Sequence, residues 1–408
     1  MNAGRSRRPS VVILSHSVTA DDPRVRRQGD AFLDRGWRVL VIGLGGARAA
    51  SPSWPLVEVD TEWCDAEGLF HRWKRQARAA AGLGALYAAA DPRMLLDLLF
   101  PGLPAMREVA RAHCPDLWLA NDWPALSVAV DIARRDGAFL VYDTHELAAE
   151  EFGHSRRWRT TRLPLVRHVE GSGICFAHLV TCVSEGIAGR LTEIYNLDRR
   201  PLVVRNVPPF ADAGKAAASA RIRLLYHGII APGRGLEQAI AASPLWRPEF
   251  HLSIRGPAPD GYAAHLETLI AAQGARDRVA LLPPVPVTEL VQEASAFDVG
   301  FFVLPDTSQQ NHHVLPNKFF EYVMAGLALC VSDLPEMAKL LNEHDLGVLA
   351  RGLAPDDIAR AVNALDRPRI AAYKANARSA ARKLCWEQEG RRLIDACEAL
   401  LLRRSSRV

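Results

Sequence analysis

The chain has few cysteines and no long apolar run, and each shortage excludes a class of protein. Its 408 residues include 7 cysteines, which are odd in number, scattered and without a C-x-x-C pair. This set argues against a disulfide framework and against a zinc site. No apolar run is long enough to span a membrane, and residues 1–8 form a polar basic tail without the apolar region of a signal peptide. We therefore expect a cytoplasmic protein with reduced, mostly buried thiols.

The chain also lacks a strong excess of charge of either sign. The formal net charge is +4, with 49% hydrophobic and 24% charged residues. These values are ordinary for a globular protein and do not indicate a nucleic-acid partner. The length predicts two or three domains, each large enough to bury its own core.

Strand-like and helix-like segments alternate, which predicts an α/β fold with parallel sheets. In the first half we expect strands at residues 11–14, 38–42, 117–120, 138–142, 179–182 and 202–204. A second series is expected at residues 222–226, 250–254, 279–282, 298–303 and 328–331. Asp22 is a predicted N-cap, with Pro23 at the first position of a helix that Gly36 ends. Helical stretches are expected at about 70–90 and 92–112, and a linker at 206–220.

Residues 315–326 carry the clearest indication of a binding site. They follow an apolar strand-like run and a polar loop, and Pro316 lies near the first turn of the helix. The N-terminal N–H groups of such a helix favour an anion, and Lys318 adds a point charge suited to phosphate. Glu321 lies one turn further on, where it can accept hydrogen bonds from ribose hydroxyls. These residues suggest a nucleotide, and the alternative is an exposed Lys318–Glu321 helical pair.

A second glycine-rich loop follows the first strand of the second series. It runs from Tyr226 to Gly235 and contains Gly228, Gly233 and Arg234. Glycines allow close approach of the backbone to a phosphate, and Arg234 can bind a diphosphate in a bidentate manner. The alternative is a glycine-rich surface turn.

Two further turns follow neighbouring strands. Gly256 comes after residues 250–254, and Val285 lies within residues 283–286, which could frame a nucleotide base through backbone groups. Ligands of open α/β sheets bind at the carboxyl edge of the strands, where both turns are expected. Strand ends also carry such residues simply as turns.

In the first half, Asp143, His145 and Glu146 come just past a buried strand. A histidine at this edge can donate a hydrogen bond to a sugar hydroxyl or exchange a proton near neutral pH. The alternative is a capping histidine satisfied by backbone groups. Asp122 also follows a strand but does not differ from a turn residue, and Ser184 is most simply an N-cap.

Residues 315–333, LPNKFFEYVMAGLALCVSD, resemble the C-terminal donor-binding signature of the GT-B, family-4-like retaining glycosyltransferases (glycosyl transferases group 1). Glu321 falls on the second glutamate of the family's E-x7-E motif, while His313 occupies the position of the first. The loop at Gly228 resembles the family's G-R-x4-K-G loop. Arg234 stands at the lysine position of that loop and Ile229 at the arginine position.

The first half resembles the same family. VYDTHELAAEEF is similar to its D-x-H-E segment, whose histidine lines the cleft against the transferred sugar. Residues 15–39 resemble the first strand–loop–helix of a subset of the family. This resemblance implies the following roles: catalytic His145, Arg234 and Lys318; donor-binding Gly228, Gly233, Arg234, Gly256, Val285, Asn317, Lys318 and Glu321; and acceptor-side His16, Asp22 and Arg24. Asp22 could instead be only an N-cap, and Arg24 only a solvated charge.

The implied fold is α/β of the GT-B class, with two Rossmann-like domains facing a central cleft. Residues 1–207 would form the acceptor-side domain and residues 208–384 the nucleotide-sugar-binding domain. Residues 385–408 would hold a helix that crosses back to the first domain. The implied reaction is transfer of a sugar, as by a hexosyltransferase of polysaccharide biosynthesis, from a nucleoside-diphosphate sugar to a hydroxyl of a glycan, glycolipid or small molecule. It needs no other cofactor and no metal.

Two rival functions and one membrane contact stay open. A nicotinamide-dependent dehydrogenase is suggested by the run from Gly43 to Gly46, although Arg48 breaks the G-x-G-x-x-G pattern. A non-catalytic nucleotide-sugar-binding protein is suggested by His313 and Ile229. Residues 70–78 mix basic and aromatic side chains, which fits either a solvated face or peripheral contact with the inner face of a membrane.

Overall fold

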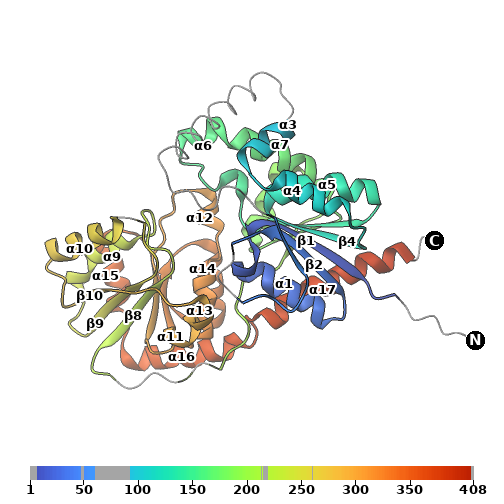
Figure 1. Ribbon diagram of the computed structural model, residues 1–408. Helices are drawn as coiled ribbons and strands as arrows, with labels where there is room; N and C mark the ends of the chain where they lie inside the picture. Colours follow the sequence, from blue (N-terminus) through green and yellow to red (C-terminus); the bar gives the residue numbers. More distant parts are fainter. Residues whose placement is uncertain are drawn as a thin grey trace, which may run out of the picture. The chain divides into compact units, whose positions relative to one another are not determined.

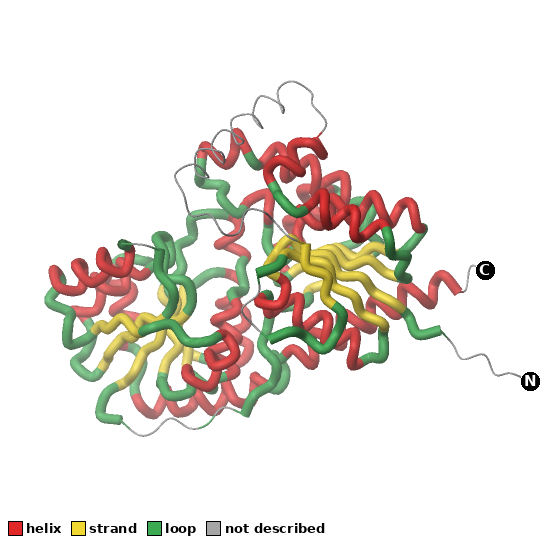
Figure 2. The backbone as a smooth tube through the Cα atoms, in the orientation of Figure 1, coloured by secondary structure: helices red, strands yellow, loops and turns green. Residues whose placement is uncertain are grey.

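The computed structural model describes residues 7–46, 50–59, 92–212, 214, 219–259 and 261–405. The predicted helix at about 70–90, the basic stretch 70–78 and Arg48 lie outside these residues. The chain divides into two compact units (Figures 1 and 2). The first comprises the described residues up to Arg205, Ser308–Gln310 and the residues from Gly390 onward, and the second comprises Asn206–Thr307 and Asn311–Glu389.

The first unit is built on a parallel sheet in the order β3-β2-β1-β4-β5-β6-β7. Its strands are β1 Ser10–Val18, β2 Arg38–Leu44, β3 Leu56–Val59, β4 Leu117–Asn121, β5 Phe139–Asp143, β6 Leu179–Cys182 and β7 Leu202–Val203. Its helices are α1 Pro23–Asp34, α3 Pro92–Leu99, α4 Leu103–Arg111, α5 Asp122–Asp136, α6 Arg156–Thr161, α7 Leu163–Ile174 and α8 Glu185–Tyr195. Figure 1 shows α4 and α5 on one face of this sheet and α1 on the other.

The second unit is built on a parallel sheet in the order β10-β9-β8-β11-β12-β13. Its strands are β8 Ile222–His227, β9 Phe250–Arg255, β10 Val279–Leu282, β11 Val299–Phe302, β12 Ala328–Ser332 and β13 Gly347–Ala350. Its helices are α9 Leu236–Ala242, α10 Tyr262–Ala272, α11 Leu290–Ala294, α13 Asn317–Met324, α14 Pro335–His344, α15 Pro355–Asn363 and α16 Arg367–Ala381. The short helix α12 Gln309–His313 begins among residues of the first unit and ends among those of the second. The last helix, α17 Trp386–Ser405, begins among residues of the second unit and ends among those of the first.

The predicted strands and most predicted helices are confirmed. Each expected strand is present within a few residues of its predicted bounds, whereas β3 and β13 were not predicted. The predicted helical stretch 92–112 is two helices, because the chain turns at Gly102, whose φ is +97°. The observed boundaries of the units lie after Arg205 and before Gly390, compared with the predicted 207/208 and 384/385.

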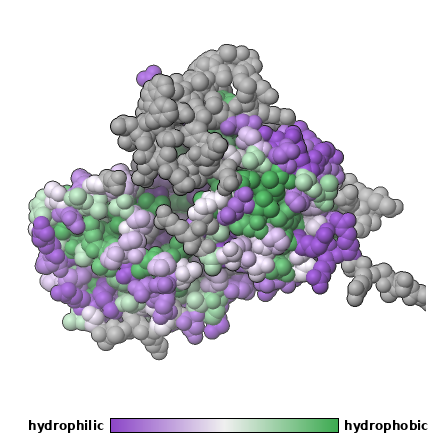
Figure 3. Space-filling view, viewed as in Figure 1, coloured by the Kyte–Doolittle hydropathy of each residue, from purple (hydrophilic) through white to green (hydrophobic). Residues whose placement is uncertain are grey.

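Buried apolar side chains fill the space between each sheet and its helices. Trp118 of β4, Tyr142 of β5 and Leu126 of α5 are fully buried in the first unit, as are Leu224 of β8 and Phe320 of α13 in the second. On the face seen in Figure 3, both units show hydrophobic as well as hydrophilic residues, and the hydrophobic ones gather in patches. Of the cysteines that the structure describes, Cys182, Cys330, Cys385 and Cys397 are buried and Cys114 and Cys175 are exposed, all as free thiols.

Within the described ranges, no helix combines the length and the apolar composition that crossing a bilayer requires.

The parallel sheets determine where functional side chains gather. Asn121 at the end of β4 is paired with Asp143 at the end of β5, and His227 at the end of β8 is paired with Arg255 at the end of β9. The carboxyl ends of neighbouring strands therefore bring distant parts of the sequence to one edge in each unit.

We predict that Leu224→Ala destabilises the second unit by about 2–5 kcal/mol, because Leu224 is fully buried between β9 and β11 and its truncation leaves a cavity. Leu245→Ala is the control, since Leu245 is 48% exposed and its truncation should change stability by only about 0.5 kcal/mol. Denaturant unfolding followed by circular dichroism measures both. Equal effects of the two substitutions would contradict the core assignment.

Candidate functional site

In the second unit, three loops meet at the carboxyl edge of the sheet. A Cβ on Gly256, after β9, would lie 1.9 Å from the carbonyl oxygen of Gly228, after β8. A Cβ on Gly235 would lie 1.8 Å from the carbonyl oxygen of Val303, after β11. Gly228, Gly233 and Gly235 also have φ values of +113°, +78° and +77°. Glycine is therefore required by close packing and by backbone conformation, which goes beyond the needs of a simple surface turn.

Lys318 extends from the first turn of α13 to this loop. Its Nζ lies 4.1 Å from the ring centroids of both Tyr226 and Phe302, and a Cβ on Gly228 would lie 3.3 Å from it. Burial, reinforced by repulsion from Arg234, lowers the pKa of Lys318 to about 7. The ammonium is thus held between two aromatic faces beside the glycine loop.

Glu321, one turn after Lys318, contacts the last residue of β8. Its Oε2 lies 2.7 Å from Nε2 of His227, whose side chain is 1% exposed while that of Glu321 is 18% exposed. The alternative that Lys318 and Glu321 form an exposed helical pair is therefore wrong, because both side chains are directed to the end of β8.

The remaining predicted donor residues lie at the same edge. Arg234 is exposed and close enough to Lys318 to affect its pKa. Asn317 is the exposed first residue of α13, and Pro316 precedes it as an N-cap without a capping side chain. Val285 follows β10, which is two strands from β8 in the sheet.

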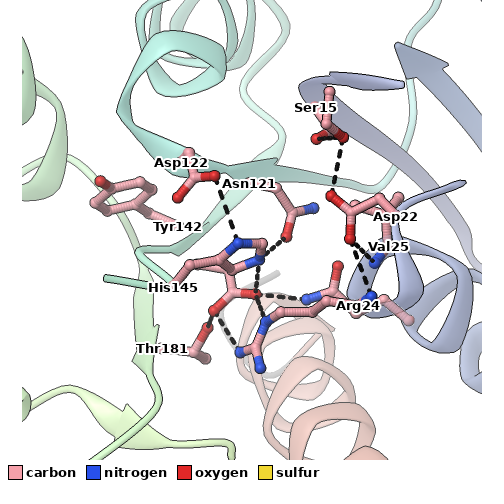
Figure 4. Close-up of polar contacts among 12 residues, drawn as sticks. Ser15, Asp22, Arg24, Val25, Asn121, Asp122, Tyr142, His145 and Thr181 are labelled. Atoms are coloured by element: carbon pink, nitrogen blue, oxygen red, sulfur yellow. Dashed lines mark hydrogen bonds and ion pairs between the residues drawn. The ribbon is translucent and has the colours of Figure 1, made fainter. Parts of the chain in front are cut away.

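In the first unit, Asp143 at the end of β5 is fully buried and accepts hydrogen bonds from three side chains (Figure 4). Arg24 donates through Nε at 2.6 Å and Nη2 at 2.7 Å, Gln28 through Nε2 at 2.6 Å and Thr181 through Oγ1 at 2.8 Å. Burial raises the pKa of Asp143, but the Arg24 and His145 charges and their hydrogen bonds outweigh it and hold the pKa far below its ordinary value.

Arg24 requires a correction. It is 1% exposed, so the alternative of a solvated charge is wrong. An acceptor-facing role through direct contact is wrong as well, because the guanidinium is held inside the unit by Asp143 and by the carbonyl of Val204 at 3.0 Å. Any effect of Arg24 on a ligand is therefore indirect, through the position of Asp143 and through its charge near His145.

His145 lies between two carboxylates (Figure 4). Its Nε2 is 3.0 Å from Oδ1 of Asn121 and 3.4 Å from Oδ2 of Asp143, and its Nδ1 is 3.4 Å from Oδ2 of Asp122. Burial opposes its protonation, but the two carboxylates outweigh burial and raise the pKa of His145 to about 9. A capping histidine satisfied by backbone groups is therefore the wrong interpretation.

The backbone at His145 is strained. His145 and Asp122 have φ values of +50° and +65°, in the left-handed region that non-glycine residues rarely adopt. Such strain persists where the surrounding structure enforces it, often at functional sites. Asp122 is the first residue of α5 and its side chain is 44% exposed, so the sequence missed a residue that contacts His145. The sequence feature that could have identified Asp122 is its position directly after a predicted strand.

The other predicted acceptor-side residues have partners within the first unit. Asp22 is confirmed as the N-cap of α1, where its Oδ1 accepts from the backbone N–H groups of Arg24 and Val25. His16 lies at the end of β1, with Nε2 2.8 Å from the carbonyl oxygen of Pro101. Ser184 is confirmed as the N-cap of α8.

Other sequence features do not form a site. Gly43 belongs to β2, and a Cβ there would lie 1.6 Å from Oγ1 of Thr19. This glycine therefore serves close packing, not a dinucleotide loop. His312 and His313 lie on α12 with their rings edge to face at 4.8 Å. In the part of the chain that the structure describes, no group of three or more His, Cys, Asp or Glu residues is arranged to hold a metal ion.

Two family models match consecutive parts of the chain. The model described as Glycosyl transferase 4-like domain matches residues 22–207, and the model described as Glycosyl transferases group 1 matches residues 221–366. D-inositol 3-phosphate glycosyltransferase of Nocardia farcinica is 28% identical over 237 residues, which cover 52% of this chain and 51% of that protein. The alignment therefore spans about half the length of this curated relative.

Solved structures share the fold. Sucrose-phosphate synthase from Thermosynechococcus elongatus matches with a TM-score of 0.74 and 15% identity, covering 97% of this chain and 100% of that one. HepE of Anabaena, in complex with UDP-glucose, matches with a TM-score of 0.69 and 16% identity, covering 96% and 99% of the two chains. Both likenesses show the two-domain GT-B fold.

The raised pKa of His145 predicts a pH-dependent stability. A histidine whose pKa rises from 6.5 to about 9 on folding stabilises the protein fully below pH 6.5 and loses that contribution as pH rises through 9. The difference in unfolding free energy between wild type and His145→Asn should therefore shrink between pH 6.5 and 9.5, and asparagine tolerates the left-handed backbone. In an Asp122→Asn background the loss should occur at lower pH. Chemical denaturation at several pH values tests this, and a constant difference would contradict it.

Proposed function

Because the chain belongs to the GT-B glycosyltransferases that join a glycosyl transferase 4-like domain to a glycosyl transferases group 1 domain, we propose that it transfers a sugar from a nucleoside-diphosphate sugar to an acceptor hydroxyl. The transfer retains the anomeric configuration and needs no metal ion. The observation that carries the proposal is the convergence of Lys318, Arg234, Glu321 and the Gly228 loop at one edge of the second unit.

The cationic groups suit a diphosphate. Lys318 and Arg234 provide positive charge, the loop after Gly228 allows close approach of a phosphate, and α13 presents its N-terminal N–H groups. In the proposed reaction these groups stabilise the negative charge that develops on the leaving diphosphate. Two cations and a helix N-terminus can neutralise this charge without a divalent ion.

Glu321 and the turn residues suit the nucleoside. The Glu321 carboxylate can accept hydrogen bonds from the two ribose hydroxyls, and its partial exposure leaves it accessible. Val285 and Gly256 lie at the same edge of the sheet, where backbone groups can contact the base and the phosphates. HepE binds UDP-glucose, and the same donor class is proposed for this chain.

The first unit supplies the acceptor side and His145. With a pKa of about 9, His145 is protonated at neutral pH and donates a hydrogen bond to a hydroxyl of the transferred sugar. In the proposed reaction, the bond from the anomeric carbon to the phosphate oxygen breaks while the acceptor oxygen attacks from the same face. The leaving phosphate oxygen takes the acceptor's proton. The acceptor is a hydroxyl of a glycan, glycolipid or small molecule.

One observation favours a second candidate, a nucleotide-sugar-binding protein without activity. Ile229, at a position where the family carries arginine, is 58% exposed and brings no charge to the loop. Donor hydrolysis or transfer above background by the purified chain excludes this candidate. Binding of the donor without turnover of any acceptor or water supports it.

The first experiment is a thermal-shift panel of UDP-, GDP- and ADP-sugars, because a ligand that binds only the folded state raises the melting temperature by mass action. We expect one nucleotide class to stabilise the protein, and its donors are then assayed for transfer with and without EDTA. The proposal requires stabilisation and EDTA-resistant turnover. If no donor in the panel stabilises the protein, the proposal is wrong.

We predict that Lys318→Met lowers turnover about 10²–10³-fold, as loss of a group that stabilises developing charge does. Wild-type affinity for the nucleoside diphosphate should fall as pH rises above about 7, where Lys318 loses its proton, and this dependence should be absent in Lys318→Met. Lys339→Met, at an exposed position of α14, is the control. Steady-state kinetics and calorimetric titration from pH 6 to 9 measure both effects. Equal activity of the two variants would contradict the assignment.

A further inference from the structure

His227 is the last residue of β8 and is buried behind Glu321. Its side chain is 1% exposed, and its Nε2 lies 2.7 Å from Oε2 of Glu321. The contact places the enclosed imidazole directly behind the Glu321 carboxylate. The neighbouring residues Tyr226 and Gly228 both lie beside Lys318, whose Nζ is 4.1 Å from the Tyr226 ring centroid and would be 3.3 Å from a Cβ on Gly228. Three consecutive residues therefore lie beside the two side chains of α13 that the donor site requires.

Tyr322 fixes the position of the His227 ring. The two rings have centroids 4.7 Å apart and are tilted by 34°, and the Tyr322 hydroxyl accepts the backbone N–H of His227 at 3.1 Å. Gly300 of β11 makes room for Tyr322, since a Cβ there would lie 2.2 Å from Cγ of the tyrosine ring. The imidazole therefore sits between Tyr322 and Glu321 in a fully enclosed position, which leaves it little rotational freedom.

We propose that His227 is a positioning residue for the nucleoside. It holds Oε2 of Glu321 and thereby orients Oε1 and the remaining lone pairs toward the two ribose hydroxyls. This inference rests on the proposed function and adds to it a residue that determines recognition of ribose over deoxyribose. Without the imidazole, the Glu321 side chain regains rotamers that do not present the carboxylate to the sugar ring.

The test compares His227→Phe with His227→Gln in the full chain. Phenylalanine keeps a ring against Tyr322 but has no nitrogen to contact Glu321, whereas glutamine carries an amide nitrogen at a position close to that of Nε2. His251→Phe on β9 is the matched control, because His251 lies on the neighbouring strand and its Nδ1 contacts only a backbone carbonyl, that of Glu249. Thermal unfolding without ligand establishes that each variant is folded.

The probes are UDP, GDP and ADP with their 2′-deoxy counterparts, titrated by calorimetry. For the diphosphate that wild type binds best, we expect a preference for the ribose form. His227→Phe should reduce this preference about tenfold, which lies within the range of interaction energies between residues in contact, and His227→Gln should restore much of it. His251→Phe should keep the wild-type preference. A purely structural defect would weaken both forms of the nucleotide equally.

Glu321→Ala identifies the route of the effect. If His227 acts through Glu321, then His227→Phe should cause no further loss of preference in a Glu321→Ala background. The inference is overturned if folded His227→Phe keeps the wild-type preference, or if the two substitutions have additive effects. If wild type binds none of the diphosphates, the proposed function itself fails. The two failures are therefore distinguishable.

Discussion

The close packing of the loop after β8 against the first turns of α13 is the constraint on which the second unit's site depends. Gly228, with no side chain, leaves the space that Nζ of Lys318 occupies, and Gly256 approaches the Gly228 carbonyl from the next strand. The rings of Tyr226 and Phe302 then surround the ammonium. Burial removes water from around the Lys318 ammonium before any ligand binds, and this desolvation costs free energy. A bound anion offsets that cost.

In the first unit, the buried charged group is a carboxylate that other side chains compensate, in contrast to the buried ammonium of Lys318. Asp143 is fully buried but has Arg24, Gln28 and Thr181 as donors, so its charge is compensated within the unit. The negative charges of Asp143 and Asp122 also raise the pKa of His145. The second unit therefore lowers the pKa of a lysine, and the first unit raises the pKa of a histidine. Both effects arise at strand ends, where buried and exposed polar groups lie side by side.

Much of the fold could be predicted from the sequence because buried parallel strands are nearly continuous apolar runs. The strands that were missed, β3 and β13, lie at the sheet edges and have mostly half-exposed residues, so they lack this pattern. Lys318, Glu321 and the Gly228 loop could be found because their local spacing has a chemical meaning. The long-range contacts that hold these residues in place could not be predicted. His227 reaches Tyr322 across 95 positions and Arg24 reaches Asp143 across 119, and no local pattern encodes such pairings.

Because Gly300 has no side chain, a residue in the second sheet determines where residues closer to the surface can lie. Gly300 lies within β11, and the ring of Tyr322 fills the space above it. Any side chain there would displace that ring and, with it, the imidazole and the carboxylate beyond. Substitution at Gly300 is thus limited by the proposed ligand contacts of Glu321 on α13, as well as by the space available in the core.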